Sequence, residues 1–386
     1  MVTKSTRRAK GSGSVRERSK AKWEVRYDGP PDAAGKRPKV YETVHGSRRD
    51  AERVLRERLG VVDSGSYVAK SSETVAEFMG KWMSTYAATN TNLRTQQGYR
   101  SQIRRNINTA LGSIPVQNLR APQIQALYAS MRRRGLAPRS VLAVHRILKE
   151  ALSHGVMWGD LARNPADTVT PPKVEKRTIS PWEVETFYKF FDCAEDSQFR
   201  DVYHVAVLTG LRRAELCGLR WTEVDLDKGE LRVFRTLQRI TGMGLVEGEP
   251  KSERSRRTFA LSQLAGDVLR QVRVKQMERQ LALGESWQGD GHVFTGANGR
   301  PIDGDRLTRD FGRIVQRSGL KKLTLHGLRH TFVALLIAGG VHPRTIADMV
   351  GHSSSSFTLD VYGHLMRGVQ EEAASAIDRQ MARGSG

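Results

Sequence analysis

The last third of the chain carries a reactive side chain in an otherwise ordinary helical segment. Residues 356–365, SFTLDVYGHL, place Tyr362 two positions before His364. A phenol can act as a nucleophile, but its pKa of about 10 means that it needs a base or a strongly cationic pocket at neutral pH. Taken alone, Tyr362 is best interpreted as a packing residue, so the other motifs of the chain decide whether it does chemistry.

Two arginine motifs precede this tyrosine and carry polar residues where packing alone would not place them. TGLRRAEL holds Arg212 and Glu215 three residues apart, so they share one face of a helix. HGLRHT holds His326 and Arg329, again three apart, at the start of an apolar helix. Guanidinium groups bind phosphate oxygens with paired donors and keep their charge at neutral pH. Each motif alone also fits a salt-bridged arginine or a structural histidine.

Two further motifs carry basic side chains. Lys251 begins a basic loop, PKSERSRR, and His352 lies in VGHSS, ten residues before Tyr362. Taken alone, Lys251 is best interpreted as a solvated lysine in a loop. His326 and His330 are four apart, but no carboxylate lies between them, so the zinc-protease pattern is absent.

The net charge is the informative bulk property of the chain. Its 386 residues carry a formal net charge of +22, an excess of one sign that favours nucleic acid as a partner. Lysines and arginines near phosphates release counterions, which makes such binding tight and sensitive to salt. The two cysteines, Cys193 and Cys217, form neither a metal-binding pattern nor a disulfide framework.

The sequence contains no signal for a membrane or for secretion. We find no run of about 18 apolar residues, as a membrane span would need. The basic N-terminal segment, MVTKSTRRAKGSGSVRERSK, is not followed by an apolar region. We therefore expect a cytoplasmic protein that is associated with the nucleoid.

Pattern and composition divide the chain into three blocks. Residues 1–65 are basic, with strand-like KWEVRYD and KRPKVYETV followed by a helix capped at Ser47. Residues 66–170 carry four amphipathic helical segments with cationic faces. Residues 171–386 begin with a proline-containing linker and go on to helices that are interrupted by strands.

Local signals predict several elements of the third block. Ser180, Pro181 and Glu183 have the spacing of a capping box, so a helix is expected to begin at Pro181. ELRVFRTLQRI and RRTFALS are strand-like, HVFTGANGRPID is typical of a strand end and turn, and everything after about Thr324 is expected to be helical. A last helix over residues 366–381 carries an apolar stripe that would dock on its own domain or on a neighbouring protomer.

Together the motifs resemble the tyrosine recombinase (phage integrase) family, in particular the integrase of a phage or an integrative element. The resemblance covers the whole third block and extends more weakly to the helical middle block. Residues 1–65 are similar to the arm-binding domain of many integrases. The motif residues stand in the family's order and near its spacing, with one residue more between the last two than in many members: Arg212, Lys251, His326, Arg329, His352 and Tyr362.

The resemblance implies a multidomain fold and a set of partners. It implies a small α+β arm-type DNA-binding domain over residues 1–65, an all-α core-binding domain over 66–170, and a mainly α catalytic domain with a small antiparallel sheet and a C-terminal tail helix over 171–386. The implied partner is double-stranded DNA at core and arm sites, bound by a homotetramer. An excision factor or a host DNA-bending protein would be an accessory partner.

The resemblance also implies the chemistry. Tyr362 would attack a DNA phosphodiester, with Arg212 and Arg329 as the clamp on its non-bridging oxygens. His326 would accept the phenol proton, and Lys251 would protonate the departing 5′ oxygen. The energy of the broken bond would be stored in a 3′-phosphotyrosine, so that neither metal, ATP nor another cofactor is needed. His352 would hydrogen-bond the phosphate or orient the nucleophile, and Glu215 would brace Arg212 or the local helix.

Two other functions fit parts of this pattern. A DNA-binding regulator could keep the fold without the activity, but it would be expected to lose one of the motif residues. A type IB-like topoisomerase would share the mechanism, but it would lack the basic N-terminal block. Relaxation of supercoiled plasmid without a specific site would identify the topoisomerase.

Overall fold

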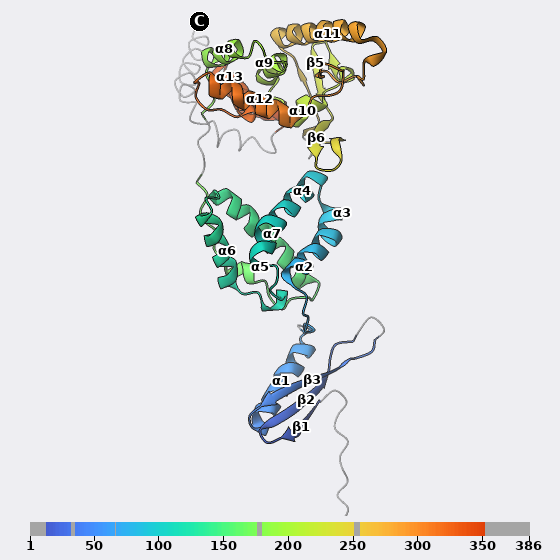
Figure 1. The fold of residues 1–386 in the computed structure, drawn as a ribbon, viewed down its shortest axis with the longest axis vertical. Coiled ribbons are helices and arrows are strands. Elements are labelled where there is room, and N and C mark those ends of the chain that lie inside the picture. Colours follow the sequence, from blue (N-terminus) through green and yellow to red (C-terminus); the bar gives the residue numbers. More distant parts are fainter. Residues whose placement is uncertain (1–12, 32–34, 66, 176–179, 251–254, 352–386) are drawn as a thin grey trace, which may run out of the picture. The chain divides into compact units, whose positions relative to one another are not determined.

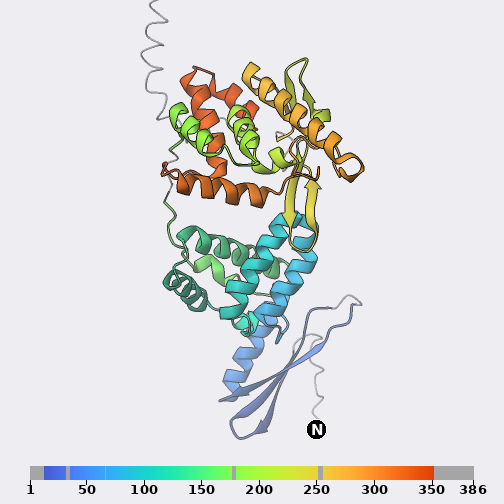
Figure 2. The ribbon, with the colours of Figure 1, turned by 45° about the horizontal axis from the view of Figure 1, so that its top comes forward.

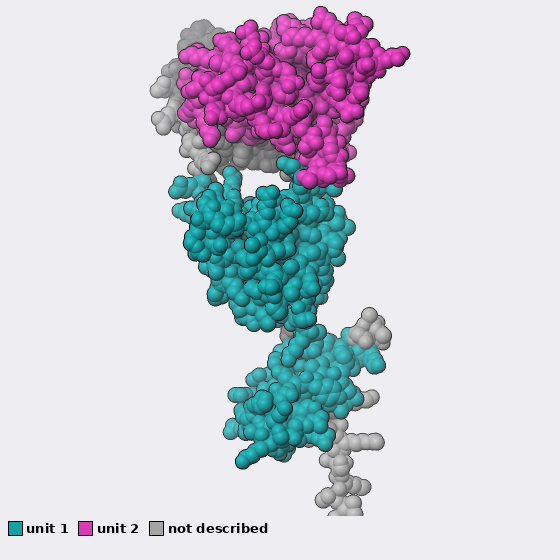
Figure 3. Space-filling model, in the orientation of Figure 1, with its two compact units in different colours: residues 1–175 teal, residues 176–386 magenta. Residues whose placement is uncertain are grey.

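The computed structural model of the chain describes five segments, residues 13–31, 35–65, 67–175, 180–250 and 255–351 (Figure 1). Lys251, His352 and Tyr362 lie outside the described residues, as does the helix predicted over residues 366–381. The chain divides into two compact units, residues 1–175 and residues 176–386 (Figure 3). Among the described residues, no helix combines the length and the apolar character that a membrane crossing requires.

The first unit begins with a three-stranded antiparallel sheet in the order β1-β2-β3, with one helix packed on it (Figure 1). Side chains of a strand alternate between the two faces of its sheet. Val25 and Tyr27 are therefore buried against Ala51 of the helix, whereas Arg26 lies on the other face, 5.9 Å from the ring of Tyr41. The elements are β1 (Ser14–Ser19), β2 (Lys22–Asp28), β3 (Lys39–His45) and α1 (Arg48–Asp63).

The predicted start of α1 is confirmed by a complete capping box. The Ser47 hydroxyl accepts a hydrogen bond from the Asp50 backbone N–H at 3.3 Å, and the Asp50 carboxylate accepts one from the Ser47 N–H at 2.9 Å. Two N–H groups at the helix start thereby gain partners. The strand predicted for KWEVRYD coincides with β2.

The rest of the first unit is helical, as the amphipathic pattern predicted. The longest helix, α7, covers the whole of the predicted segment PRSVLAVHRILKEALSHGVM. The helices are α2 (Val75–Trp82), α3 (Ala88–Asn90), α4 (Leu93–Gln102), α5 (Asn108–Leu111), α6 (Ala121–Arg133) and α7 (Pro138–Met157).

Two of these helical segments contain a turn of π-helix, which holds one residue more than an α-helical turn. The first π turn, Met83–Ala87, joins α2 to α3, and the second, Ile103–Ile107, joins α4 to α5. Beside the first turn, the buried ring of Trp82 stacks on Tyr99 at 5.4 Å. Its indole N–H donates to Nδ1 of His154 at 3.0 Å, so the buried donor is satisfied.

The second unit packs helices with two small antiparallel sheets (Figures 1 and 2). One sheet has the order β4-β5-β8, and β6 pairs with β7 as a hairpin. The strands are β4 (Val224–Asp225), β5 (Glu230–Val233), β6 (Thr236–Ile240), β7 (Gly244–Gly248) and β8 (Arg257–Ala260). The helices are α8 (Val184–Cys193), α9 (Arg200–Thr209), α10 (Arg213–Gly218), α11 (Gln263–Leu283), α12 (Gly304–Arg317), α13 (Leu325–Ala338) and α14 (Pro343–Val350).

The capping box predicted at Ser180 is wrong. Helix α8 begins at Val184 with Glu183 as its N-cap residue. The preceding residues are held by tertiary contacts instead, because the Ser180 hydroxyl accepts from Lys321 Nζ at 2.6 Å and the Trp182 indole N–H donates to the Lys321 carbonyl at 2.8 Å. The residue spacing fits a capping box, but contacts with Lys321 determine the conformation of these residues.

The strand-like segments of this unit form strands. ELRVFRTLQRI holds two of them, because β5 ends at Val233, β6 begins at Thr236, and the two pair with different partners. RRTFALS contains β8, and HVFTGANGRPID contains a turn and isolated bridges, such as Thr295 with Pro301. The helices predicted after Thr324 are confirmed as far as Val350 by α13 and α14.

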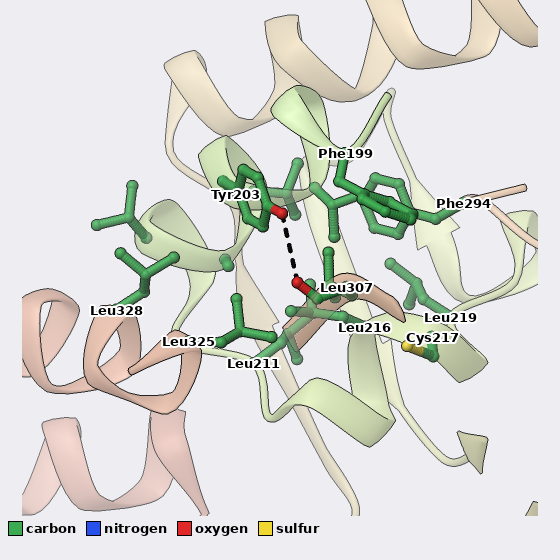
Figure 4. Packing of buried hydrophobic residues seen from close by; sticks show 14 of the residues in the cluster. Phe199, Tyr203, Leu211, Leu216, Cys217, Leu219, Phe294, Leu307, Leu325 and Leu328 are labelled. Carbon is green, nitrogen blue, oxygen red and sulfur yellow. Dashed lines mark hydrogen bonds between the residues drawn. The ribbon is translucent and has the colours of Figure 1, made fainter. Parts of the chain in front are cut away.

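The core of the second unit is aromatic where α8, α9 and α12 meet. Tyr203 lies in this core, fully buried, with its ring at 5.4 Å from those of Phe190 and Phe311. Its hydroxyl lies 3.4 Å from the Leu307 carbonyl (Figure 4). It also donates to Asp310 Oδ2 at 2.8 Å. Burial raises the pKa of this phenol, and so does the hydrogen bond to Asp310. Tyr203 is therefore a structural residue.

We predict that Tyr203→Phe lowers the free energy of unfolding by about 1–2 kcal/mol, because it removes one buried hydrogen bond while keeping the ring. The Asp310 carboxylate keeps a partner in the Ser197 hydroxyl at 2.6 Å, which limits the loss. Urea unfolding of the full chain would measure the change. A variant as stable as the parent would show that the phenol hydroxyl contributes nothing to this core.

Candidate active site

The candidate site is built around Arg212, which stands at the N-cap position of α10. Its backbone N–H donates to Glu215 Oε2 at 2.9 Å, and its Nη1 donates to Glu215 Oε1 at 2.7 Å. Its Nη2 donates to the Gly351 carbonyl at 2.7 Å. The side chain is 35% exposed, so it is partly accessible to solvent although these hydrogen bonds hold its guanidinium.

The partner of Arg212 is a deeply buried carboxylate. The Glu215 side chain is 2% exposed and also accepts from Arg257, at 2.9 Å from Nη2 and 3.2 Å from Nη1. Burial alone would raise the pKa of Glu215. The hydrogen bonds and charges of Arg257 and Arg212 outweigh this effect and lower the pKa to about 2. Glu215 is therefore ionised at neutral pH and holds two guanidinium groups.

The second predicted clamp residue, Arg329, is buried on α13. Its Nη1 donates to the Gly210 carbonyl at 2.8 Å, and its Nη2 donates to the Val350 carbonyl. Gly210 ends α9 with a φ of +61°, a left-handed conformation that suits glycine. A Cβ at Gly210 would lie 2.3 Å from the ring of Phe332. The glycine thus brings a carbonyl to Arg329 where no other residue fits.

Three arginines from separate elements reach the same helix end. Arg257, Arg329 and Arg212 donate to the carbonyls of Met349, Val350 and Gly351 respectively. These are C-terminal carbonyls of α14, which have no partner within the helix and lie at its negative end. The structure therefore brings the TGLRRAEL and HGLRHT motifs together beside the point where VGHSS begins.

His326 lies at the start of α13, one turn before Arg329. Desolvation lowers the pKa of His326, and the positive charges of Arg329 and Arg212 lower it further. Its ring is 5.0 Å from that of His330, and burial lowers the pKa of His330 to about 4. Both histidines are therefore neutral near pH 7, and a neutral imidazole can accept a proton.

Arg257 is a member of this cluster that the sequence motifs did not single out. It is the first residue of β8, and its side chain is 5% exposed. In the sequence it stands beside Arg256 in a basic run, and only its burial distinguishes the two. The strand alternation of RRTFALS puts Arg257 on the face of Phe259, which was the one available signal.

Within the part of the chain that the structure describes, one group of side chains has the spacing of a metal site. Glu247, Asp290 and His292 bring one ligand atom each to within 4.8 Å of one another. However, the Arg220 guanidinium donates to both carboxylates, and Arg235 Nη1 lies 3.8 Å from Glu247 Oε2. A cation would have to displace a bound arginine, so this group is interpreted as an ion-pair network.

Two family models match the chain. The phage integrase family matches residues 177–367, and the phage integrase N-terminal SAM-like domain matches residues 74–132. The chain belongs to the phage integrase family. It is a site-specific tyrosine recombinase of a mobile element, and the expected multidomain fold with a mainly α catalytic domain is confirmed.

This recombinase is similar to several known proteins along most of its length. A XerC-like tyrosine recombinase of Caldanaerobacter subterraneus subsp. tengcongensis is 27% identical, and the match covers 86% of this chain and 90% of the relative. An integrase of Streptomyces ambofaciens is 28% identical, with 98% of both chains covered. The Tn1549 transposon integrase bound to a circular intermediate DNA has a similar fold, with a TM-score of 0.67 and 22% identity over 80% of this chain and all of that one.

We predict that Glu215→Gln lowers the free energy of unfolding of the second unit at neutral pH and removes part of the pH dependence of that free energy. The folded-state pKa of Glu215 lies below its ordinary value, so the ionised group stabilises the fold above about pH 4.5, and this stabilisation is lost as the pH falls toward 2. A shift from 4.5 to about 2 corresponds to about 3 kcal/mol.

Urea unfolding of the full chain between pH 3 and pH 7, with pulsed amide exchange to follow β8, would measure this effect. Glu185→Gln, an exposed change on α8, is the matched control. If the stability of the Glu215→Gln variant depended on pH as that of the parent does, Glu215 would not be the titrating group.

Proposed function

We propose that this recombinase cuts and rejoins DNA through Tyr362, which attacks a phosphodiester and forms a 3′-phosphotyrosine. One observation carries the proposal. Arg212 and Arg329 are far apart in the sequence, yet their guanidinium groups converge on two consecutive carbonyls, those of Val350 and Gly351. The sequence that follows these carbonyls directly contains His352 and Tyr362.

Arg212 and Arg329 act as the clamp on the phosphate. The reacting phosphodiester gains negative charge on its non-bridging oxygens, and two permanently charged guanidinium groups stabilise that charge through N–H donors. Their orientation by Glu215 and by the Gly210 carbonyl supports this role, because groups that are already oriented need not reorganise during the reaction. Electrostatic stabilisation of this kind does not call for a metal.

Two side chains that carry nitrogen would transfer the protons of the reaction, His326 as the acceptor and Lys251 as the donor. As the phenol oxygen of Tyr362 bonds to phosphorus, its proton passes to His326, whose lowered pKa keeps it neutral and able to accept. The 5′ oxygen leaves with the electrons of its bond to phosphorus and takes a proton from Lys251. His352 donates a hydrogen bond to the phosphate. The reverse attack by a 5′ hydroxyl rejoins the strand, so the phosphotyrosine conserves the bond energy without ATP.

The proposed substrate is double-stranded DNA, bound by four copies of the chain. The net charge of +22 supports binding to a polyanion. A λ integrase tetramer bound to a Holliday junction has a similar fold, with a TM-score of 0.57 and 19% identity. We further propose core-site binding by residues 66–170, catalysis by residues 171–386, action in the cytoplasm at the nucleoid, and assistance from an excision factor or a host DNA-bending protein.

The N-terminal sheet is the proposed reader of arm sites. Its open face carries Arg26 and Tyr41, which lie 5.9 Å apart, and Tyr41 is 56% exposed. A cation and a planar ring on the free face of a sheet suit contact with phosphates and base edges in a groove. We assign residues 1–65 to this arm-type domain on that basis.

We predict that Tyr362→Phe binds DNA like the parent but forms no covalent product, because only the phenol oxygen is removed. The substrate is a nicked duplex that carries the junction sequence of the native element, and the covalent complex is separated by denaturing electrophoresis. Tyr203→Phe, which removes a buried phenol oxygen elsewhere in the same unit, is the matched control and should retain the covalent product.

The same experiment separates the alternative functions. A covalent band in Tyr362→Phe would move the nucleophile to another residue. A parent protein that binds the junction but never becomes attached to it would be a regulator that has kept the fold. Relaxation of supercoiled plasmid without the junction sequence would indicate a topoisomerase.

We predict that the double variant Arg26→Ala, Tyr41→Ala loses protection of arm sites in a footprint while core-site cleavage stays within about twofold of the parent. The reason is that both side chains lie on the open face of the N-terminal sheet and leave its buried face intact. Arg48→Ala, an exposed change on α1, is the control. Deletion of residues 1–65 should have the same selective effect, and an unchanged footprint would contradict the arm-binding role.

A further inference from the structure

Arg257 is the buried arginine of the cluster and carries no role in the proposed reaction. Its side chain is 5% exposed, and every one of its three guanidinium nitrogens makes a hydrogen bond. Nη1 and Nη2 donate to the two oxygens of Glu215, and Nη1 also donates to the Ser255 carbonyl at 3.0 Å. Nε donates to the Met349 carbonyl at 2.6 Å. A charge so buried is stable only when it is paired in this way.

We propose that Arg257 is a positioning residue for strand cleavage, which fixes the clamp residue Arg212 through Glu215 and fixes the end of α14 through Met349. The inference rests on the proposed function, since it assumes that Arg212 grips the phosphate. All three guanidinium nitrogens of Arg257 donate to Glu215, Ser255 or Met349, so its effect on the reaction passes through the groups that it holds.

The first link is the shared carboxylate. Oε1 of Glu215 accepts from Nη1 of Arg212 at 2.7 Å and from Nη1 of Arg257 at 3.2 Å. Oε2 accepts from the Arg212 backbone N–H at 2.9 Å and from Nη2 of Arg257 at 2.9 Å. An ionised carboxylate has about four acceptor positions, and here all four are used. The two bonds from Arg257 therefore fix the orientation of the Glu215 carboxylate. That orientation in turn fixes the position of the Arg212 guanidinium.

The second link is the end of α14. This helix packs through a small cluster of its own, in which Ile346 and Val350 lie against Phe332, Val333 and Ile337. Hydrogen bonds from the arginines join its last carbonyls to α10, β8 and α13. These bonds decide where the chain leaves the helix toward His352 and Tyr362.

The two links differ in what happens when a phosphate arrives. The Arg212 side chain is 35% exposed, and its Nη2 can exchange the Gly351 carbonyl for a phosphate oxygen. Arg257 is closed to solvent and keeps the Met349 carbonyl. The end of α14 thus stays anchored while Arg212 turns to the substrate. Lysine cannot replace Arg257 here, because one ammonium group cannot span a carboxylate and a carbonyl with a planar fork.

The test is single-turnover cleavage of the nicked junction duplex by the full-length chain at saturating protein. Arg257→Lys should cleave about 10- to 100-fold more slowly, since a shift of the order of 1 Å in a catalytic group costs rate on that scale. Its dissociation constant for the same duplex should stay within about twofold of the parent. Arg235→Lys is the matched control, because Arg235 also pairs with a buried glutamate, Glu223, and should cleave at the parent rate.

A mutant cycle separates positioning from a general loss of stability. Arg257 acts on Arg212 through Glu215 and also holds α14 through Met349, so the double variant Arg212→Lys, Arg257→Lys should lose less rate than the product of the two single losses. Single losses that multiply in full would show that Arg257 does not act through Arg212 and would overturn the proposal. If Arg257→Lys does not fold, as judged by circular dichroism and DNA binding, Glu215→Asp takes its place in the cycle, because the shorter carboxylate cannot reach both arginines.

The outcomes distinguish this inference from the proposed function. Cleavage by Arg257→Lys at the parent rate, with Arg212→Lys slow, would overturn the positioning role and leave the clamp intact. Cleavage at the parent rate by Arg212→Lys, or a covalent product with Tyr362→Phe, would instead contradict the proposed function.

Discussion

A single buried carboxylate, that of Glu215, is the interaction on which the candidate site depends. Removing a charged group from water costs several kcal/mol, and only close partners offset that cost. Here two guanidinium groups supply them, so the carboxylate stays ionised and in turn orders both arginines. With Arg329 added, positive groups outnumber the negative one, and the cluster keeps a net positive charge that a phosphate can neutralise.

The backbone around this carboxylate also positions the arginines. The left-handed turn at Gly210 stops α9 and starts the short segment that presents Arg212 at the beginning of α10. The carbonyl of Gly210 meanwhile receives Arg329 from α13. The Gly210 peptide group therefore joins two elements that are distant in the sequence. It fixes the position of the Arg329 charge relative to the start of α10.

The sequence predicted those parts of the fold and site that depend on local chemistry. Helix α7 and the cap at Ser47 follow from spacing and capping alone, and Arg212, Glu215 and Arg329 follow from motifs. The predicted cap at Ser180 was wrong, because its hydroxyl is used by Lys321, a partner 141 positions away that no local pattern shows. Arg257 was missed for the same reason, since its burial depends on where Glu215 and Met349 lie.

The two π turns of the first unit have a consequence for comparing related sequences. Each turn accommodates one residue more than regular helix would, and each lies directly between two α-helical segments. A relative that has a regular helix at the same place would be one residue shorter there. An alignment would then need a gap in the middle of a helix, where gaps are normally penalised, and placing it elsewhere would shift every buried position after Trp82 or Ile103 onto the wrong face. Part of the low identity between such helices can therefore reflect misplaced register instead of divergence.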